Sequence, residues 1–347
     1  MSDLVCAPPR VAQSGHLVGL GTDYRVADEI TSARHREGAS SRMESATRLL
    51  CASAGLDWLC GREDEDSPEE TDRRVKAMPR VTVNGTELYY EIRGKGPPVL
   101  LIMGATGDGG HFDALADVLS DEFTVVSYDR RGNGRSPAPD GWETTSPHEQ
   151  ADDAAALLDA LGTGPAAVLG TSSGGNFALC LMVRHPGSVR GAILHEPGLY
   201  ALVDDFDAVR APLRALVEEA MTAGGPPAAV ERFWCYVAGD DGWQRLSPAL
   251  RERLRATAST LFEVELGTYE LYLPSEEELA ALSAPVRLLV SEDSLPFWAE
   301  IAGRLGEQLG VDVTTTPGTH ATYHEHPQQL AELIRPFLRE VSGMRRA

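Results

Sequence analysis

The chain is poor in cysteine, in aromatic residues and in positive charge. Of its 347 residues five are cysteines, and none of them stands in a Cys-x-x-Cys pair. This pattern predicts reduced thiols that pack as small buried side chains, and it argues against a disulfide framework or a zinc ribbon. The 31 Lys and Arg are outnumbered by 52 Asp and Glu, which gives a formal net charge of −21. Because such a charge repels phosphate backbones and anionic lipid surfaces, we expect neither a nucleic acid nor a membrane partner.

Long apolar stretches are also missing. The longest strongly apolar run, from Val99 to Met103, is far shorter than the roughly 20 residues that a membrane-spanning helix needs. The first residues show no basic segment followed by an apolar one, so no secretory signal is visible. We therefore expect a cytoplasmic protein. The hydrophobic content of 42% is still enough for a sizeable core.

Residues 1–77 read differently from the rest of the chain. Beyond one weak helical stretch they show no regular pattern, and they end in an acidic, proline-broken segment that begins at Glu63. Two interpretations stay open for this N-terminal extension. It is either disordered, or the result of a start assigned upstream of a natural beginning at Met78. Residues 78–347 are expected to form the folded domain.

The pattern of strands and helices begins immediately after Met78. Two β-rich runs flank Asn84-Gly85, a pair typical of a hairpin turn. Apolar runs typical of buried strands follow at residues 98–103, 123–129, 166–170, 191–196, 286–290 and 311–316. Helical patterns lie between the earlier ones, at residues 111–119, 149–161 and 175–183. This alternation predicts an α/β protein with a mostly parallel, doubly wound sheet.

One long interval interrupts the alternation. From about residue 197 to residue 284 there are helical stretches but no run typical of a core strand. We expect a helical cap inserted into the α/β domain. Its aromatic residues are Trp234, Tyr236, Trp243, Phe262 and Tyr269. They are expected to form the cap's own core, and a cap of this kind also roofs a pocket.

The most informative motif is Gly-Thr-Ser-Ser-Gly at residues 170–174, where a buried strand ends and a helix begins. It fits the Gly-x-Ser-x-Gly nucleophile elbow, in which glycines let strand and helix pass closely while the central serine occupies a strained turn. Ser172 is therefore the predicted nucleophile. The backbone N–H of Ser173, at the start of the helix, can face a developing oxyanion.

With this motif in its setting, the chain from about residue 81 to its C-terminal helix resembles the serine hydrolases of the α/β-hydrolase superfamily, in their esterase and haloperoxidase-like branch. Met103-Gly104-Ala105 stands where that family usually has His-Gly-x. The resemblance implies that the Ala105 N–H is the second oxyanion donor. Because this donor is backbone, Met103 should change the packing of the loop more than the chemistry. The resemblance also implies structural roles for Asp129 and Arg130.

The general base is expected last in the chain, because this fold orders its triad as Ser, acid and His. His320 follows the final predicted strand, at a distance from Pro327 that matches the closing motif of the family. His324 and His326 stand nearby, but spacing alone does not make a zinc site, so we expect no metal ion. No glycine-rich segment fits a nucleotide-binding fingerprint, and no cofactor is expected.

Two carboxylates compete for the acid of the triad. The resemblance places the acid after the seventh strand, where this chain has Ser294, with Asp293 one residue early. Asp293 is also a suitable N-cap for the helix that follows. Glu196 ends the sixth strand, a position from which some relatives in the superfamily supply their acid. Both carboxylates stay open as the group that orients His320 and stabilises its imidazolium.

Together these residues imply hydrolysis of an ester, thioester or lactone through an acyl-enzyme on Ser172. A haloperoxidase-like perhydrolase, a carbon-carbon bond hydrolase and a thioesterase or cyclase acting on a carrier-bound acyl chain share the same machinery and are alternatives. A non-catalytic ligand-binding protein of this fold is the alternative outside catalysis. The alanine-rich, aromatic cap favours an apolar small-molecule substrate.

Overall fold

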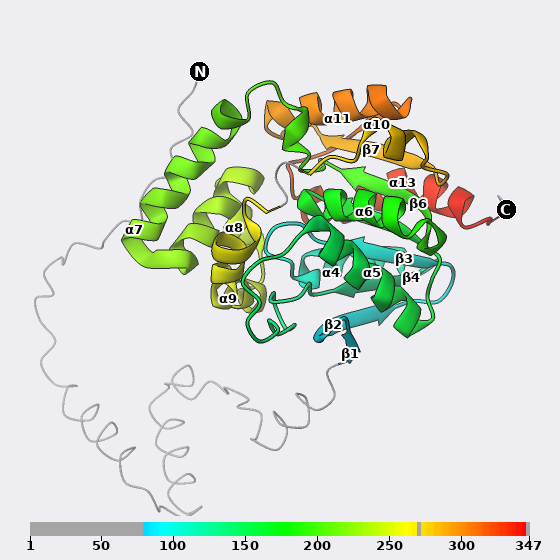
Figure 1. Ribbon diagram of the computed structural model, residues 1–347, viewed down its shortest axis with the longest axis horizontal. Coiled ribbons are helices and arrows are strands. Elements are labelled where there is room, and N and C mark those ends of the chain that lie inside the picture. Colours follow the sequence, from blue (N-terminus) through cyan, green and yellow to red (C-terminus); the bar gives the residue numbers. More distant parts are fainter. Residues whose placement is uncertain (1–78, 269–271, 345–347) are drawn as a thin grey trace, which may run out of the picture. The chain divides into compact units, whose positions relative to one another are not determined.

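A single eight-stranded sheet forms the centre of the computed structural model, which describes residues 79–268 and 272–344. The interpretations of residues 1–77 and of Tyr269 lie outside the described residues. The sheet has the strand order β1-β2-β4-β3-β5-β6-β7-β8 (Figure 1). The strands are β1 (Arg80–Val83), β2 (Thr86–Arg93), β3 (Pro98–Ile102), β4 (Thr124–Tyr128), β5 (Ala166–Thr171), β6 (Val189–His195), β7 (Val286–Ser291) and β8 (Val313–Thr316).

Only one edge of the sheet is antiparallel. β2 pairs antiparallel with both β1 and β4, whereas all neighbours from β4 to β8 are parallel. The predicted hairpin turn joins β1 to β2, with φ of 45° at Asn84 and 76° at Gly85. Positive φ at both central residues is the geometry that an Asn-Gly pair tolerates. The predicted mostly parallel α/β sheet is confirmed.

The connections between the parallel strands are helical. The α-helices are α4 (Asp113–Leu119), α5 (Pro147–Leu161), α6 (Ser173–Arg184), α7 (Phe206–Ala238), α8 (Gly242–Arg245), α9 (Pro248–Ala256), α10 (Glu276–Ala280), α11 (Pro296–Leu309), α12 (Thr322–Glu325) and α13 (Pro327–Val341). Short helical turns are η2 (Gly109–Phe112), η3 (Pro186–Ser188), η4 (Tyr200–Leu202) and the π-helical η5 (Thr260–Glu265). Local chemistry sets their ends: Ser146 caps α5 by accepting from the N–H of Glu149, and Gly162 ends it with a φ of 63°.

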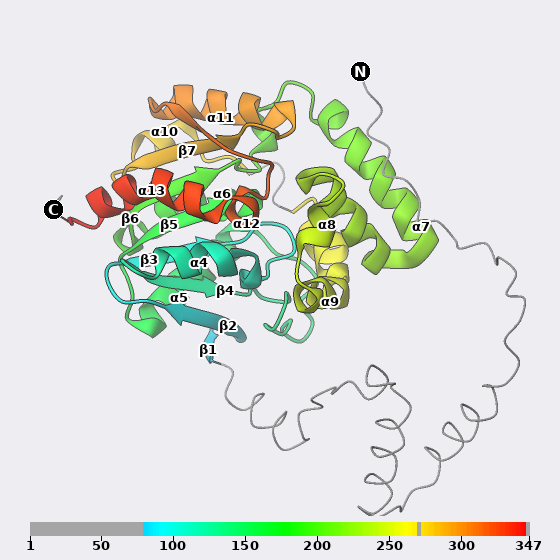
Figure 2. The ribbon, with the colours of Figure 1, turned by 180° about the vertical axis from the view of Figure 1, so that it is seen from behind.

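Helices cover both faces of the sheet, as the two opposite views in Figures 1 and 2 show. Successive side chains of a strand point to opposite faces, so each face has its own core. In β3, Val99 and Leu101 belong to the core shared with α4 and α13. Leu100 and Ile102 belong to the core shared with α5, α6 and α11. The apolar run that begins at residue 98 is thus buried on both sides, as a central parallel strand requires.

Between β6 and β7 the chain forms a helical insert, which we define as α7, α8, α9 and η5 (Figure 1). Its α7 is interrupted at Gly225, where φ is 69°. Trp234 and Trp243 are buried in the core that the insert shares with one face of the sheet. Trp234 stacks on His111 of η2, with 4.6 Å between ring centres. The insert is therefore packed on the α/β body through aromatic contacts.

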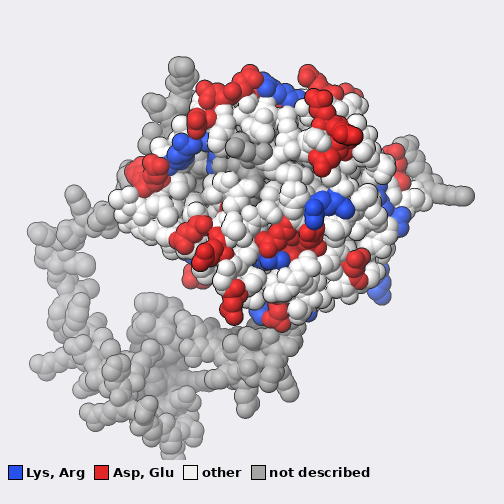
Figure 3. Space-filling model, in the orientation of Figure 1, with Lys and Arg blue, Asp and Glu red and all other residues white. Residues whose placement is uncertain are grey.

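Acidic side chains predominate over basic ones on the face of the molecule shown in Figure 3. This distribution follows the overall excess of Asp and Glu in the sequence. Within residues 79–268 and 272–344, no helix combines the length and the hydropathy needed to cross a bilayer.

Candidate active site

The predicted nucleophile, acid and base positions all follow strands that are neighbours in the sheet. Ser172 follows β5, Glu196 follows β6, Asp293 follows β7 and His320 follows β8. These four strands are consecutive in the sheet and parallel. Because the carboxyl ends of parallel strands meet at one edge, residues that are up to 148 positions apart come together there.

The turn at Ser172 has the backbone geometry of a nucleophile elbow. Ser172 has φ of 56° and ψ of −133°, which is an unusual conformation for a residue other than glycine. A Cβ at Gly170 would lie 2.2 Å from the carbonyl oxygen of Gly174, and one at Gly174 would lie 2.2 Å from that of Ile102. The Ser172 N–H donates to the His195 carbonyl at 3.0 Å. The two flanking glycines are thus required by the close crossing of strand and helix.

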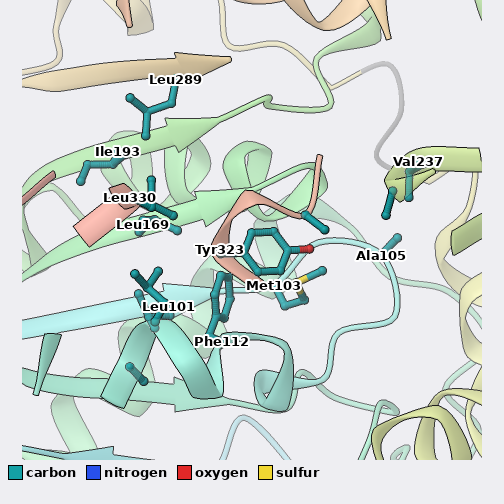
Figure 4. Close-up of a cluster of buried hydrophobic side chains, with 14 of the residues drawn as sticks. Leu101, Met103, Ala105, Phe112, Leu169, Ile193, Val237, Leu289, Tyr323 and Leu330 are labelled. Atoms are coloured by element: carbon teal, nitrogen blue, oxygen red, sulfur yellow. The ribbon is translucent and has the colours of Figure 1, made fainter. Parts of the chain in front are cut away.

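The loop after β3 passes directly beside the serine. A Cβ on Gly104 would lie 2.8 Å from the Ser172 Cβ and 2.9 Å from the backbone nitrogen of Ser173. Ala105 and Ser173, the two predicted oxyanion donors, line one pocket together with Ser172. Met103 is buried in the core below this loop, near Phe112 and Tyr323 (Figure 4). The structure therefore brings both predicted backbone segments to the nucleophile.

Of the two candidate acids, the structure pairs Glu196 with His320. The Glu196 Oε2 and the His320 Nδ1 share a short hydrogen bond, and the Glu196 Oε1 accepts the N–H of Ser291 at 2.8 Å. Glu196 is fully buried and has a positive φ of 44°. Asp293 instead has an exposed side chain, and its backbone N–H donates to the carbonyl of Gly318 at 2.9 Å.

The electrostatics keep Glu196 ionised. Burial by itself raises the pKa of this carboxyl group, but His195 and His320 outweigh that effect, with help from nearby Ser294, and lower the pKa to about 2. At neutral pH the buried, negatively charged carboxylate of Glu196 therefore lies against the His320 imidazole.

A tryptophan fixes the plane of the histidine ring. Trp298 of α11 is buried and stacks on His320, with 4.6 Å between ring centres and 13° between ring planes. Ser172 and His320, both among the described residues, form no hydrogen bond with each other. The hydrogen bond between a nucleophile and its base is often long or poorly aligned until substrate binds.

A second layer of polar residues lies below the site, and sequence reasoning did not find it. His195 Nδ1 hydrogen-bonds to Thr171 Oγ1 at 2.9 Å, and its Nε2 hydrogen-bonds to Ser291 Oγ at 2.9 Å. Ser291 Oγ in turn lies 3.0 Å from Thr316 Oγ1. Burial lowers the pKa of His195 to about 4, so the ring is neutral at pH 7. Each of the four residues is the last of its strand, and a polar residue ending an apolar run was the available signal.

A pocket lies in front of Ser172. Besides Ala105, Ser172, Ser173 and Gly198, it is lined by Tyr200, Arg210, Phe233, Leu261 and Leu266. The insert supplies Arg210 and Phe233 from α7, and Leu261 and Leu266 from η5 and the residue that follows it. The walls of the pocket are mainly apolar, and Arg210 adds a charged side chain.

The other histidines near the end of the chain have separate contacts. His324 Nε2 lies 3.2 Å from the carbonyl oxygen of Arg245, and His326 precedes α13 as its N-cap. In the part of the chain that the structure describes, no group of three or more His, Cys, Asp and Glu side chains is arranged to hold a metal ion.

Several known proteins are similar to this chain in sequence or in structure. Residues 97–232 match the family described as alpha/beta hydrolase fold. An uncharacterized hydrolase of Bacillus subtilis, YraK, is 30% identical over 263 residues, covering 74% of this chain and 94% of the relative. A zearalenone hydrolase of Cladophialophora bantiana is 26% identical over 267 residues, covering 73% and 93%. The solved structure of a thermophilic esterase from Thermogutta terrifontis is 26% identical with a TM-score of 0.57, covering 76% and 98%. The chain belongs to the α/β-hydrolase family and is a hydrolase of that fold.

Proposed function

We propose that this hydrolase cleaves an ester-like small molecule, an ester, thioester or lactone, through an acyl-enzyme on Ser172. The observation that carries the proposal is the buried, ionised Glu196 hydrogen-bonded to His320 at the sheet edge where Ser172 stands in an elbow. A histidine held in this way is prepared to take a proton and to carry positive charge while it does so. The relatives that are named hydrolase or esterase agree with this chemistry.

In the first half of the proposed mechanism, the Ser172 oxygen attacks the carbonyl carbon of the substrate and its proton passes to His320 Nε2. The carbonyl oxygen becomes an oxyanion, which the backbone N–H groups of Ala105 and Ser173 stabilise. Glu196 stabilises the imidazolium through the hydrogen bond at Nδ1. The tetrahedral intermediate then collapses, the carbon–oxygen or carbon–sulfur bond breaks, and the leaving group takes the proton from His320.

In the second half, His320 removes a proton from water, and the resulting hydroxide attacks the acyl carbon. The bond from this carbon to the Ser172 oxygen breaks, and the serine recovers its proton from His320. The acid product leaves. A pocket with mainly apolar walls suits a small substrate with an apolar acyl or alcohol group.

A fluorophosphonate probe tests this proposal, because it reacts with an activated serine and adds a known mass. The proteins compared are the wild type, Ser172→Ala and Ser188→Ala, whose serine lies in η3 away from the pocket. We expect one adduct on the wild type and on Ser188→Ala, and none on Ser172→Ala, by intact mass spectrometry. Hydrolysis of a panel of p-nitrophenyl esters should follow the same order. An adduct that persists on Ser172→Ala, or a wild type that never reacts, would contradict the proposal, and the second result would favour a ligand-binding protein.

A further inference from the structure

A buried ion pair joins the loop after β4 to the helical insert. Arg130 Nη1 lies 2.6 Å from Glu265 Oε1, and Arg130 Nη2 lies 2.9 Å from Oε2. Both side chains are completely buried. Asn133 Nδ2 donates to the same Glu265 carboxylate at 2.9 Å, and the Arg130 guanidinium also lies 4.9 Å from the ring centre of Phe177. A buried pair of this kind is costly to break from one side only, because the remaining charge loses its partner.

The same arginine holds the loop that carries Ala105. Arg130 Nε donates to the carbonyl oxygen of Met103 at 2.9 Å, and Nη2 donates to that of Gly104 at 2.8 Å. The backbone N–H of Arg130 donates to the carbonyl of Gly107 at 2.8 Å. One residue thus fixes three carbonyl groups of the loop after β3.

The Gly104 carbonyl is the important one for chemistry. It belongs to the same planar peptide group as the N–H of Ala105, and in a trans peptide the two bonds point in opposite directions. Fixing the carbonyl toward Arg130 therefore fixes the N–H toward the opposite side. The positive charge at the carbonyl also polarises the peptide, which strengthens the N–H as a donor.

Glu265 links this arrangement to the substrate pocket. It is the last residue of η5, and Leu261 and Leu266 of the same segment line the pocket with Ser172. The insert segment that contacts the substrate space is thus the one that neutralises and orients Arg130.

We propose that Arg130 is a positioning residue for the oxyanion hole and that Glu265 of the insert holds it in place. This couples the seating of the insert to the orientation of the Ala105 N–H. The inference rests on the proposed serine mechanism and assigns Arg130 a role in the reaction in addition to the structural one expected from sequence.

The test compares Glu265→Gln with a matched change in a neighbouring pair. Arg131 binds Asp153 through two 2.6 Å contacts, also buried, but does not touch the loop after β3, so Asp153→Asn is the control. A double variant, Arg130→Met with Glu265→Leu, removes both charges together and so avoids a buried unpaired charge. The measurements are the rate constant of Ser172 phosphonylation by a fluorophosphonate, kcat and KM with p-nitrophenyl butyrate, and Tm.

We expect both Glu265→Gln and the double variant to lower the phosphonylation rate constant and kcat about 10- to 100-fold. Complete loss of one oxyanion donor lowers kcat by about 100- to 1,000-fold, and these variants only misplace the donor. KM should stay within about threefold of the wild-type value. The Asp153→Asn protein should keep both rates within about threefold, even where its Tm falls. Equal rates in the wild type and the double variant, or an equal loss in Asp153→Asn, would overturn the inference alone. A wild type in which Ser172 does not react would overturn the proposed function and the inference with it.

Discussion

Replacing Glu196 by glutamine tests the triad at the member that sequence reasoning left open. The carboxylate makes two contacts, with Oε1 accepting the Ser291 N–H and Oε2 bonded to His320 Nδ1. A glutamine that keeps its oxygen on Ser291 must turn its NH₂ toward Nδ1, and an NH₂ can only donate. The His320 ring would then carry its proton on Nε2, which is the nitrogen that must accept the proton of Ser172.

The expected loss is large because two effects add. The tautomer is wrong, and the imidazolium loses a carboxylate whose pKa the site holds near 2, against 4.5 for an ordinary glutamate. An Asp-to-Asn change at the corresponding place in a serine protease triad costs about 10,000-fold in kcat. We therefore expect Glu196→Gln to lower kcat by about 1,000- to 10,000-fold, with a small change in KM. Asp293→Asn, at an exposed carboxylate, should stay within about threefold.

The assay is steady-state hydrolysis of p-nitrophenyl esters by the wild type and both variants, with circular dichroism and Tm to confirm that each is folded. Fluorophosphonate labelling should slow in parallel with kcat, because it needs the same base. If Asp293→Asn lost activity and a folded Glu196→Gln kept it, the pairing of Glu196 with His320 would have no catalytic meaning. The acid would then be supplied from β7.

Two further predictions concern stability and packing. Burial lowers the pKa of His195 to about 4 and that of His111 to about 3, against 6.5 for an ordinary histidine. As the pH falls, the unfolded chain therefore binds these protons before the folded one does. The free energy of unfolding should fall below pH 6.5, by about 2 kcal/mol per histidine between pH 7 and pH 5. In urea unfolding between pH 7 and pH 5, the His111→Phe variant should lose about 2 kcal/mol less of its free energy of unfolding than the wild type. The same pH dependence in both proteins would refute this prediction. Gly104→Ala places a methyl group 2.8 Å from the Ser172 Cβ and should lower kcat about 100-fold. Gly303→Ala, with open space at its Cβ, should leave kcat unchanged. Equal kcat values in the two variants would contradict this prediction.

The strands could be predicted because burial on both faces leaves a continuous apolar run in the sequence. The limits of such a run are less certain. The final strand was expected from Val311 but begins at Val313, because the Val311 N–H donates to the carbonyl of Gly306 and so completes the end of α11, where Gly310 has a φ of 66°. A local hydrogen bond decided a boundary that hydropathy could not.

The strained turn at Ser172 could be predicted because its flanking glycines are required by a local crossing, whereas the choice between Glu196 and Asp293 could not be made. Glu196 and Asp293 each follow a strand at the same edge of the sheet, and one residue of offset decides whether a side chain faces the site or the solvent. The contacts of Arg130 were beyond local reasoning as well. Its partner Glu265 stands 135 residues away, in a segment whose sequence gives no sign of this pairing.

The negative charge of Glu196 also acts on the hydrogen bonds that cross the four strand ends. Each hydroxyl in this row can donate or accept, so these bonds alone leave both directions of donation open. His195 Nε2 lies 4.0 Å from the Glu196 carboxylate, and this negative charge favours a proton on that nitrogen. With the proton there, Ser291 accepts from Nε2–H and donates to Thr316, and Nδ1 accepts from Thr171. The carboxylate that orients one histidine therefore also favours the proton position of a second, so the protonation states of two strand ends are set together.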